Sequence, residues 1–127
     1  MKYTNFFVQF CAQGSFGMRA EAVSNLYLPD DKQLSPEQSA RMLELGWNGP
    51  TNLPDELEPD GMKADGSPNY FIDAARPVPF DLLAQLATRT LRGIFAAKHP
   101  GNLAYRAMNA TGDSIRFPNL GIRQWVK

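Results

Sequence analysis

The chain is poor in the two residue types that perform most protein chemistry, with one cysteine and one histidine among 127 residues. A lone cysteine, Cys11, excludes an internal disulfide and is typical of proteins from a reducing compartment. One Cys and one His are also too few to form a structural zinc site. The sequence therefore predicts no metal and no cofactor.

Long hydrophobic runs and an excess of either charge are absent as well. The 13 basic residues are balanced by 13 acidic ones, and no basic run interleaves with aromatic residues. No apolar stretch approaches the ~20 residues that a membrane-spanning helix needs, and the N-terminus has no signal-length apolar stretch. We expect a cytoplasmic protein with no nucleic-acid partner and no membrane insertion.

The length fits one domain over residues 1–127, and leaves open whether the chain is a whole protein or part of a longer one. Residues 48–68 are rich in proline, glycine and acidic side chains and show no hydrophobic period. An irregular segment of this length is either a mobile loop or a functional one.

Residues 4–28 show the two-residue period of a long β-hairpin. A three-residue loop, Gln13 to Ser15, would keep the even positions of both arms on one face and place Gln9 opposite Arg19. This even face is the predicted core side, with Phe10 near its centre. Its apolar residues are Phe6, Val8, Phe10, Ala12, Phe16, Met18, Ala20, Ala22, Leu26 and Leu28.

The odd face of the hairpin is less polar than a solvent-exposed face should be. Such a face usually packs against something else, and an extended client segment held by main-chain pairing is our leading interpretation. Cover by the chain's own helix or loop, or by a second subunit in a homodimer, stays open. The candidate partner-binding residues, four apolar ones and a polar pair at the rim, are Tyr3, Phe7, Val23, Tyr27, Arg19 and Glu21.

The remaining elements follow from caps and periodicity. Ser35 and Gln38 form a capping box that begins a helix with Pro36 at its first position, and Gly46 is placed to end it. A third strand is expected at 69–75, a long amphipathic helix at 80–97, and two more strands at 103–110 and 114–117. The predicted fold is α+β, an antiparallel sheet of about five strands packed against two main helices in the order β-β-α-β-α-β-β.

No catalytic constellation is present. His99 precedes a proline at a helix end, where a dipole partner is expected, and nothing obvious lowers the pKa of Cys11. We therefore predict a non-enzymatic domain. One alternative is a small-molecule-binding domain or enzyme, with a pocket between the sheet and the 48–68 loop that presents Asp73, Arg19 and His99. Another is a purely structural domain of a larger protein.

Several short strings resemble the actinobacterial TY-Chap domains, which are similar to type III secretion chaperones of the CesT and YbjN-like group. The strongest are Arg19-Ala-Glu-Ala-Val-Ser-Asn25 and Leu45-Gly-Trp47, and the resemblance spans roughly residues 5–105. It implies an α+β fold that binds peptide segments of a client and often dimerises, and it implies no catalytic motif. The secretion chaperones open with a helix, whereas this chain opens on a strand.

Overall fold

The structure, a computed structural model, describes residues 5–51 and 66–125. These form two compact units, the first ending at Phe95 and the second beginning at Ala96. The ends of the predicted 48–68 loop are described and paired. Asn48 bridges to Phe71, and Thr51 N–H donates to the carbonyl oxygen of Ser67 over 2.8 Å.

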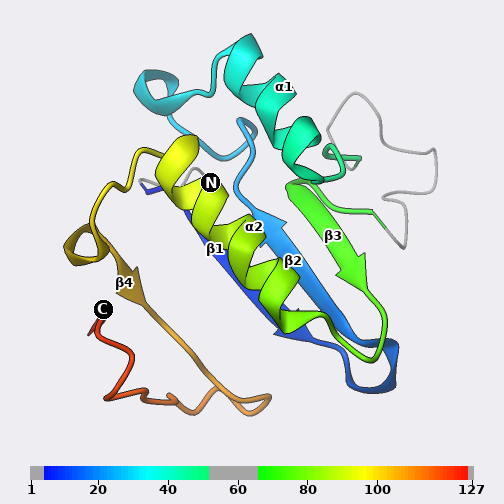
Figure 1. Cartoon of the computed structure of the whole chain (residues 1–127), viewed down its shortest axis with the longest axis vertical. Coiled ribbons are helices and arrows are strands. Elements are labelled where there is room, and N and C mark those ends of the chain that lie inside the picture. The colour runs from blue at the N-terminus through cyan, green and yellow to red at the C-terminus, as the bar shows by residue number, and fades with distance from the viewer. Residues whose placement is uncertain (1–4, 52–65, 126–127) are drawn as a thin grey trace. The chain divides into compact units, whose positions relative to one another are not determined.

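The first unit is built on a three-stranded antiparallel sheet in the order β1-β2-β3 (Figure 1). The strands are β1 (Val8–Ala12), β2 (Met18–Ala22) and β3 (Tyr70–Ala74). The α+β class is confirmed. The expected single sheet of about five strands is wrong, because the remaining two strands lie in the second unit and pair only with each other.

The hairpin keeps the predicted face but not the predicted register. Its loop has three residues, Gly14–Phe16, and so lies one residue later than expected. Gln13 N–H donates to Gly17 O over 2.8 Å, and Gln9 consequently faces Glu21 in place of Arg19. Gly17 explains the position: its φ is +100°, and a Cβ there would strike the backbone of β3.

Helix α1 (Pro36–Leu45) begins and ends as predicted. Ser35 Oγ accepts from Gln38 N–H over 3.1 Å, and Gln38 Oε1 accepts from Ser35 N–H over 2.8 Å. Gly46 then adopts a left-handed conformation that ends the helix.

Helix α2 (Phe80–Gly93) ends earlier than the expected residue 97. After Gly93 the backbone leaves the helix, and both Ile94 and Phe95 enter the core. The ring of Phe95 stacks on that of Phe6 with 4.8 Å between centroids. Periodicity alone did not reveal this early end, because both residues also fit the apolar stripe of a longer helix.

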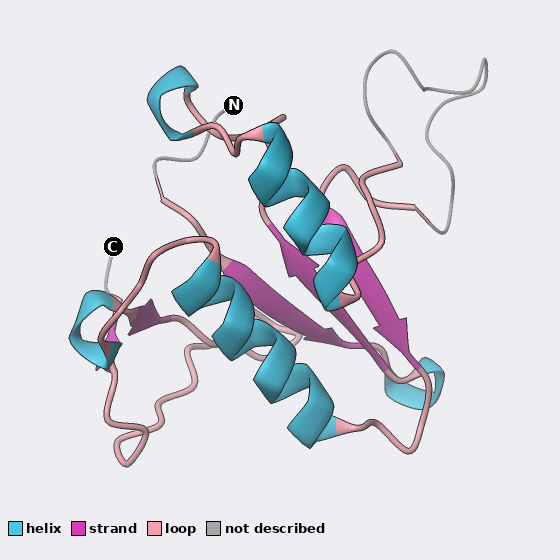
Figure 2. Ribbon diagram, turned by 45° about the horizontal axis from the view of Figure 1, so that its top comes forward, coloured by secondary structure: helices cyan, strands magenta, loops and turns pink. Residues whose placement is uncertain are grey.

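The core lies between the sheet and α2, which crosses one face of the sheet (Figure 2). Ala20 and Ala22 on β2 are fully buried there, as the even-face prediction requires. The fully buried hydroxyl of Thr90 is satisfied in this core: Thr90 Oγ accepts from Trp47 Nε1–H over 2.9 Å and donates to Leu86 O over 2.7 Å.

Two hairpin residues exchange their expected environments. Phe10, expected in the core, is 46% exposed, because β1 is an edge strand that α2 covers only in part. Val23, expected on the outer face, is 0% exposed. Strand β2 ends at Ala22, so the alternation no longer applies at Val23, and its side chain joins the core.

The second unit has less regular structure than the sequence predicted. Its strands are β4 (Ala104–Tyr105) and β5 (Arg123–Gln124), which pair in parallel. The expected strand at 114–117 is reduced to one antiparallel bridge between Met108 and Ser114. No helix in the described ranges is long and apolar enough to cross a membrane.

Candidate functional site

The apolar residues of the predicted binding face do not form an open patch. Phe7 and Tyr27 are half-buried and pack against the core, and Val23 lies within it. Tyr3 lies outside the described residues. The chain itself thus covers Val23 fully and Phe7 and Tyr27 in part.

Arg19 extends from β2 on the face opposite α2 and is held by the chain's own groups. Its Nε and Nη2 donate to the two carboxylate oxygens of Asp73 over 2.7 and 2.8 Å, and its Nη1 donates to Gly66 O over 2.8 Å. The guanidinium also lies over the Phe71 ring, 4.9 Å from the centroid. Its hydrogen bonds hold the pKa of Asp73 below the usual range, against an opposing effect of burial.

Glu21 is the second polar residue of this face and is equally engaged. It accepts from Gln9 Nε2 over 2.9 Å and from the hydroxyl of Ser67. Ser67 N–H in turn donates to Thr51 Oγ1 over 2.9 Å. Arg19 and Glu21 thus tie the sheet to residues 66 and 67, and both are already engaged within the chain.

The small-molecule alternative required Asp73, Arg19 and His99 to lie in one pocket, and only two of the three lie in the same unit. Arg19 and Asp73 do come together, but as an ion pair whose charges cancel. His99 belongs to the second unit, where its Nδ1 accepts from Gly101 N–H over 2.9 Å. Within the described ranges, no three His, Cys, Asp or Glu side chains are grouped so that they could hold a metal ion.

The outer edge of β1 is a feature that the sequence analysis did not locate. Gln13 N–H and Phe7 O both bond to the β2 side, so odd positions of β1 face β2 and even positions face outward. The backbone groups of Val8, Phe10 and Ala12 therefore point away from the sheet. In the described part of the chain, β1 pairs with β2 alone, and residues 9–12 are exposed.

The opposite edge of the sheet is already occupied in part. Asn48 and Phe71 exchange two backbone hydrogen bonds, of 2.9 and 3.1 Å, on the outer side of β3. A bound strand would have to displace this bridge. β1 therefore offers the more accessible edge of the two.

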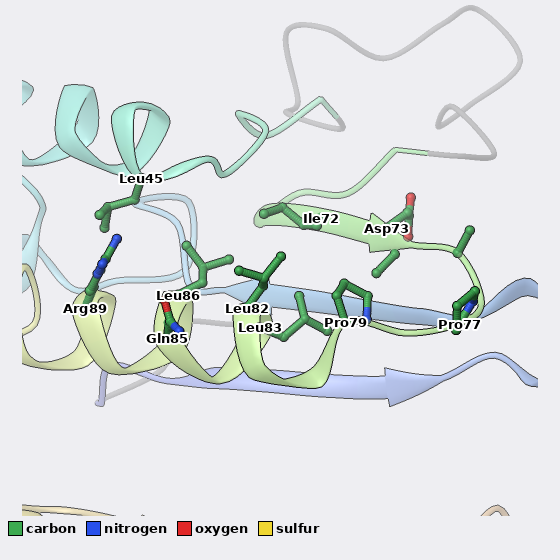
Figure 3. A pocket seen from close by; sticks show the side chains of 12 residues that line it. Leu45, Ile72, Asp73, Pro77, Pro79, Leu82, Leu83, Gln85, Leu86 and Arg89 are labelled. Carbon is green, nitrogen blue, oxygen red and sulfur yellow. The ribbon is translucent and has the colours of Figure 1, made fainter.

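A groove between β3 and α2 is a second feature that periodicity did not reveal (Figure 3). It is open, has a volume of about 560 Å³, and is lined mainly by aliphatic side chains and prolines. The single best sequence signal for it was the width of the apolar stripe on α2, which extends to the exposed Leu82.

Comparison with known proteins decides the family. The TY-Chap3 family model, described as "T3SS (YopN, CesT) and YbjN peptide-binding chaperone 3", matches residues 2–109. The chain belongs to the TY-Chap3 family. Comparisons with curated proteins and with solved structures give no match.

The TY-Chap3 match confirms the resemblance of the sequence strings to TY-Chap domains and covers most of the chain. The family is one of peptide-binding chaperones, which agrees with a non-enzymatic client-binding role for this TY-Chap3 domain. The observed helices and antiparallel sheet are consistent with such a fold.

Proposed function

We propose that this domain is a non-enzymatic chaperone that holds an extended client segment along the outer edge of β1. The observation that carries the proposal is the outward direction of the backbone groups at Val8, Phe10 and Ala12 on an exposed edge strand. Such groups form a template for main-chain pairing with another strand.

The edge is favoured over the sheet face because the polar side chains of that face are already hydrogen-bonded within the chain. Arg19 is bonded to Asp73 and Gly66, and Glu21 to Gln9 and Ser67. Of the residues proposed from the sequence, Phe7 and Tyr27 keep a supporting role, because they pack the start and the end of the hairpin onto the core.

Side-chain recognition at this edge would centre on Phe10. Its ring lies on the α2 side of β1 and is 46% exposed, so a neighbouring client strand can cover it. Main-chain bonds would give affinity for many sequences, and Phe10 would favour client residues with apolar side chains at the facing position.

Phe10→Pro tests the proposal. Proline at an edge position removes an outward N–H and leaves the β1–β2 ladder intact, so the fold should persist while pairing at the edge is lost. Phe10→Thr is the matched control, because it removes the ring but keeps the N–H and a strand-forming side chain.

The probe is a displayed library of random peptides enriched on the wild-type protein. Peptides bound at the edge should lose most of their affinity for Phe10→Pro and keep more of it for Phe10→Thr. Equal binding of every enriched peptide to wild type and a folded Phe10→Pro variant would contradict edge pairing.

A homodimer through the same edge is the second candidate. Two β1 edges paired antiparallel would satisfy the same backbone groups, as isologous interfaces do. Light scattering on wild type and Phe10→Pro separates the two: a wild-type dimer that becomes a monomer in the variant would favour self-pairing.

We place the domain in the cytoplasm, because its exposed, unpaired Cys11 suits a reducing compartment.

A further inference from the structure

The groove between β3 and α2 is apolar along most of its length. Leu45, at the end of α1, and Ile72, on β3, face Leu82, Leu83 and Leu86 of α2 across it (Figure 3). Leu82 is 64% exposed although it lines this concave surface. The volume of about 560 Å³ falls inside the ~300–1,000 Å³ range of small-ligand sites.

The charges at the groove are unequal. Asp73 lies toward the end where β3 leaves the sheet, and its carboxylate is already paired with Arg19. Arg89 lies toward the other end, beside Leu45 (Figure 3). Its exposed guanidinium has no hydrogen bond or ion pair with any residue of the described ranges. The groove therefore presents one uncompensated positive charge, at one end of an apolar floor.

We infer that this groove binds an apolar peptide stretch that carries one Asp or Glu side chain where it passes Arg89. The aliphatic floor selects apolar side chains, and the unpaired guanidinium selects a carboxylate, which it can bind in bidentate geometry. The inference rests on the peptide-binding role proposed above but not on the edge of β1, because the groove lies at the β3 side of the sheet.

Two pairs of variants test the inference on folded protein. Leu82→Asp places a charge on the groove floor, and Leu43→Asp is its control, since Leu43 is comparably exposed but does not line the groove. Arg89→Glu reverses the charge at the groove end, and Arg92→Glu does so on the same helix outside the groove. All four positions are exposed, so each variant should fold.

The probes are amidated synthetic copies of the peptides that the wild-type protein enriches from the random library. Leu82→Asp should weaken groove-bound peptides at least about tenfold, because it removes the burial of one leucine side chain. Leu43→Asp should leave them nearly unchanged. Arg89→Glu should weaken them roughly two- to fivefold or more, the range of an exposed ion pair, and Arg92→Glu should not.

A charge exchange makes the carboxylate claim specific. When the peptide's Asp or Glu is replaced by Lys, its affinity for wild type should fall, and its affinity for Arg89→Glu should rise above that of the acidic peptide. The inference would be overturned if the peptides that Leu82→Asp weakens carried no acidic residue, or if Leu82→Asp and Leu43→Asp had equal effects. So would a wild-type dimer that Leu82→Asp dissociates, because a second copy would then fill the groove.

The same panel keeps the two proposals apart. If every enriched peptide is lost on Phe10→Pro and kept on Leu82→Asp, the edge proposal stands and the groove inference is wrong. If peptides are lost on Leu82→Asp and kept on Phe10→Pro, the groove inference stands without the edge. No enriched peptide at all would count against both.

Discussion

Replacing Val23 with aspartate should strongly destabilise the first unit, whereas the same replacement at Phe10 should be tolerated. Val23 is 0% exposed, so the variant loses the burial of a valine, about 1.5–3 kcal/mol. It also buries an unpaired carboxylate, which costs about 1–3 kcal/mol or more. A loss of roughly 3–6 kcal/mol approaches the ~5–15 kcal/mol by which a typical domain is stable.

Phe10 is 46% exposed, so only about half of its burial can be lost, roughly 1 kcal/mol, and the new carboxylate stays hydrated. The assay is urea unfolding followed by the fluorescence of the buried Trp47. Trp125, in the second unit, is replaced by Phe in every sample so that one reporter remains. If Phe10→Asp lost as much stability as Val23→Asp, or if Val23→Asp matched its parent, the described packing of the hairpin would be wrong.

Three further predictions concern single contacts of the first unit. Thr90→Val should lower the free energy of unfolding by about 1–3 kcal/mol although its shape is conserved, because the buried Trp47 N–H loses its acceptor; urea unfolding measures this. Gly17→Ala should cost roughly 1–3 kcal/mol, from its positive φ and the clash with β3, and a thermal melt at the wild-type midpoint would contradict it. Because Arg19 lowers the pKa of Asp73, their pair should stabilise the fold above pH ~4 and lose this effect as pH falls through the lowered pKa. The carboxylate is 47% exposed, so the stability difference from Asp73→Asn should stay under about 1 kcal/mol at pH 7 and vanish in acid.

Local rules in the sequence predicted the local elements well. The capping box of Ser35 and Gln38 and the stop at Gly46 bound α1 as expected, because these signals act through bonds within one turn of helix. The hairpin's even face also turned to the core at Ala20 and Ala22, since alternation fixes which residues share a face.

What the sequence did not predict depends on tertiary neighbours. The loop position follows from the contact of Gly17 with β3, 57 residues further on at Ala74. The exposure of Phe10 follows from the edge position of β1, and strand order is not encoded in the period of one strand. The partner of Asp73 could not be named either, because Arg19 reaches it only once β2 and β3 pair.

The candidate site shows the same division. Alternation correctly placed Arg19 and Glu21 on the face away from the core, but only the structure shows that Asp73, Gln9 and Ser67 occupy them. The edge of β1 and the groove beside α2 arise from packing between elements, and only the groove had a sequence signal, the width of the apolar stripe on α2.

The most direct test of edge binding is amide hydrogen exchange in the free and the peptide-bound protein, read residue by residue by NMR. The amides of Phe10 and Ala12 point outward and should exchange fast in the free protein, and those of Gln9 and Cys11 bond to β2 and should exchange slowly. A bound library peptide should slow exchange at Phe10 and Ala12 by at least about tenfold and leave Gln9 and Cys11 protected as before. Saturating peptide that leaves exchange at Phe10 and Ala12 unchanged would contradict the account.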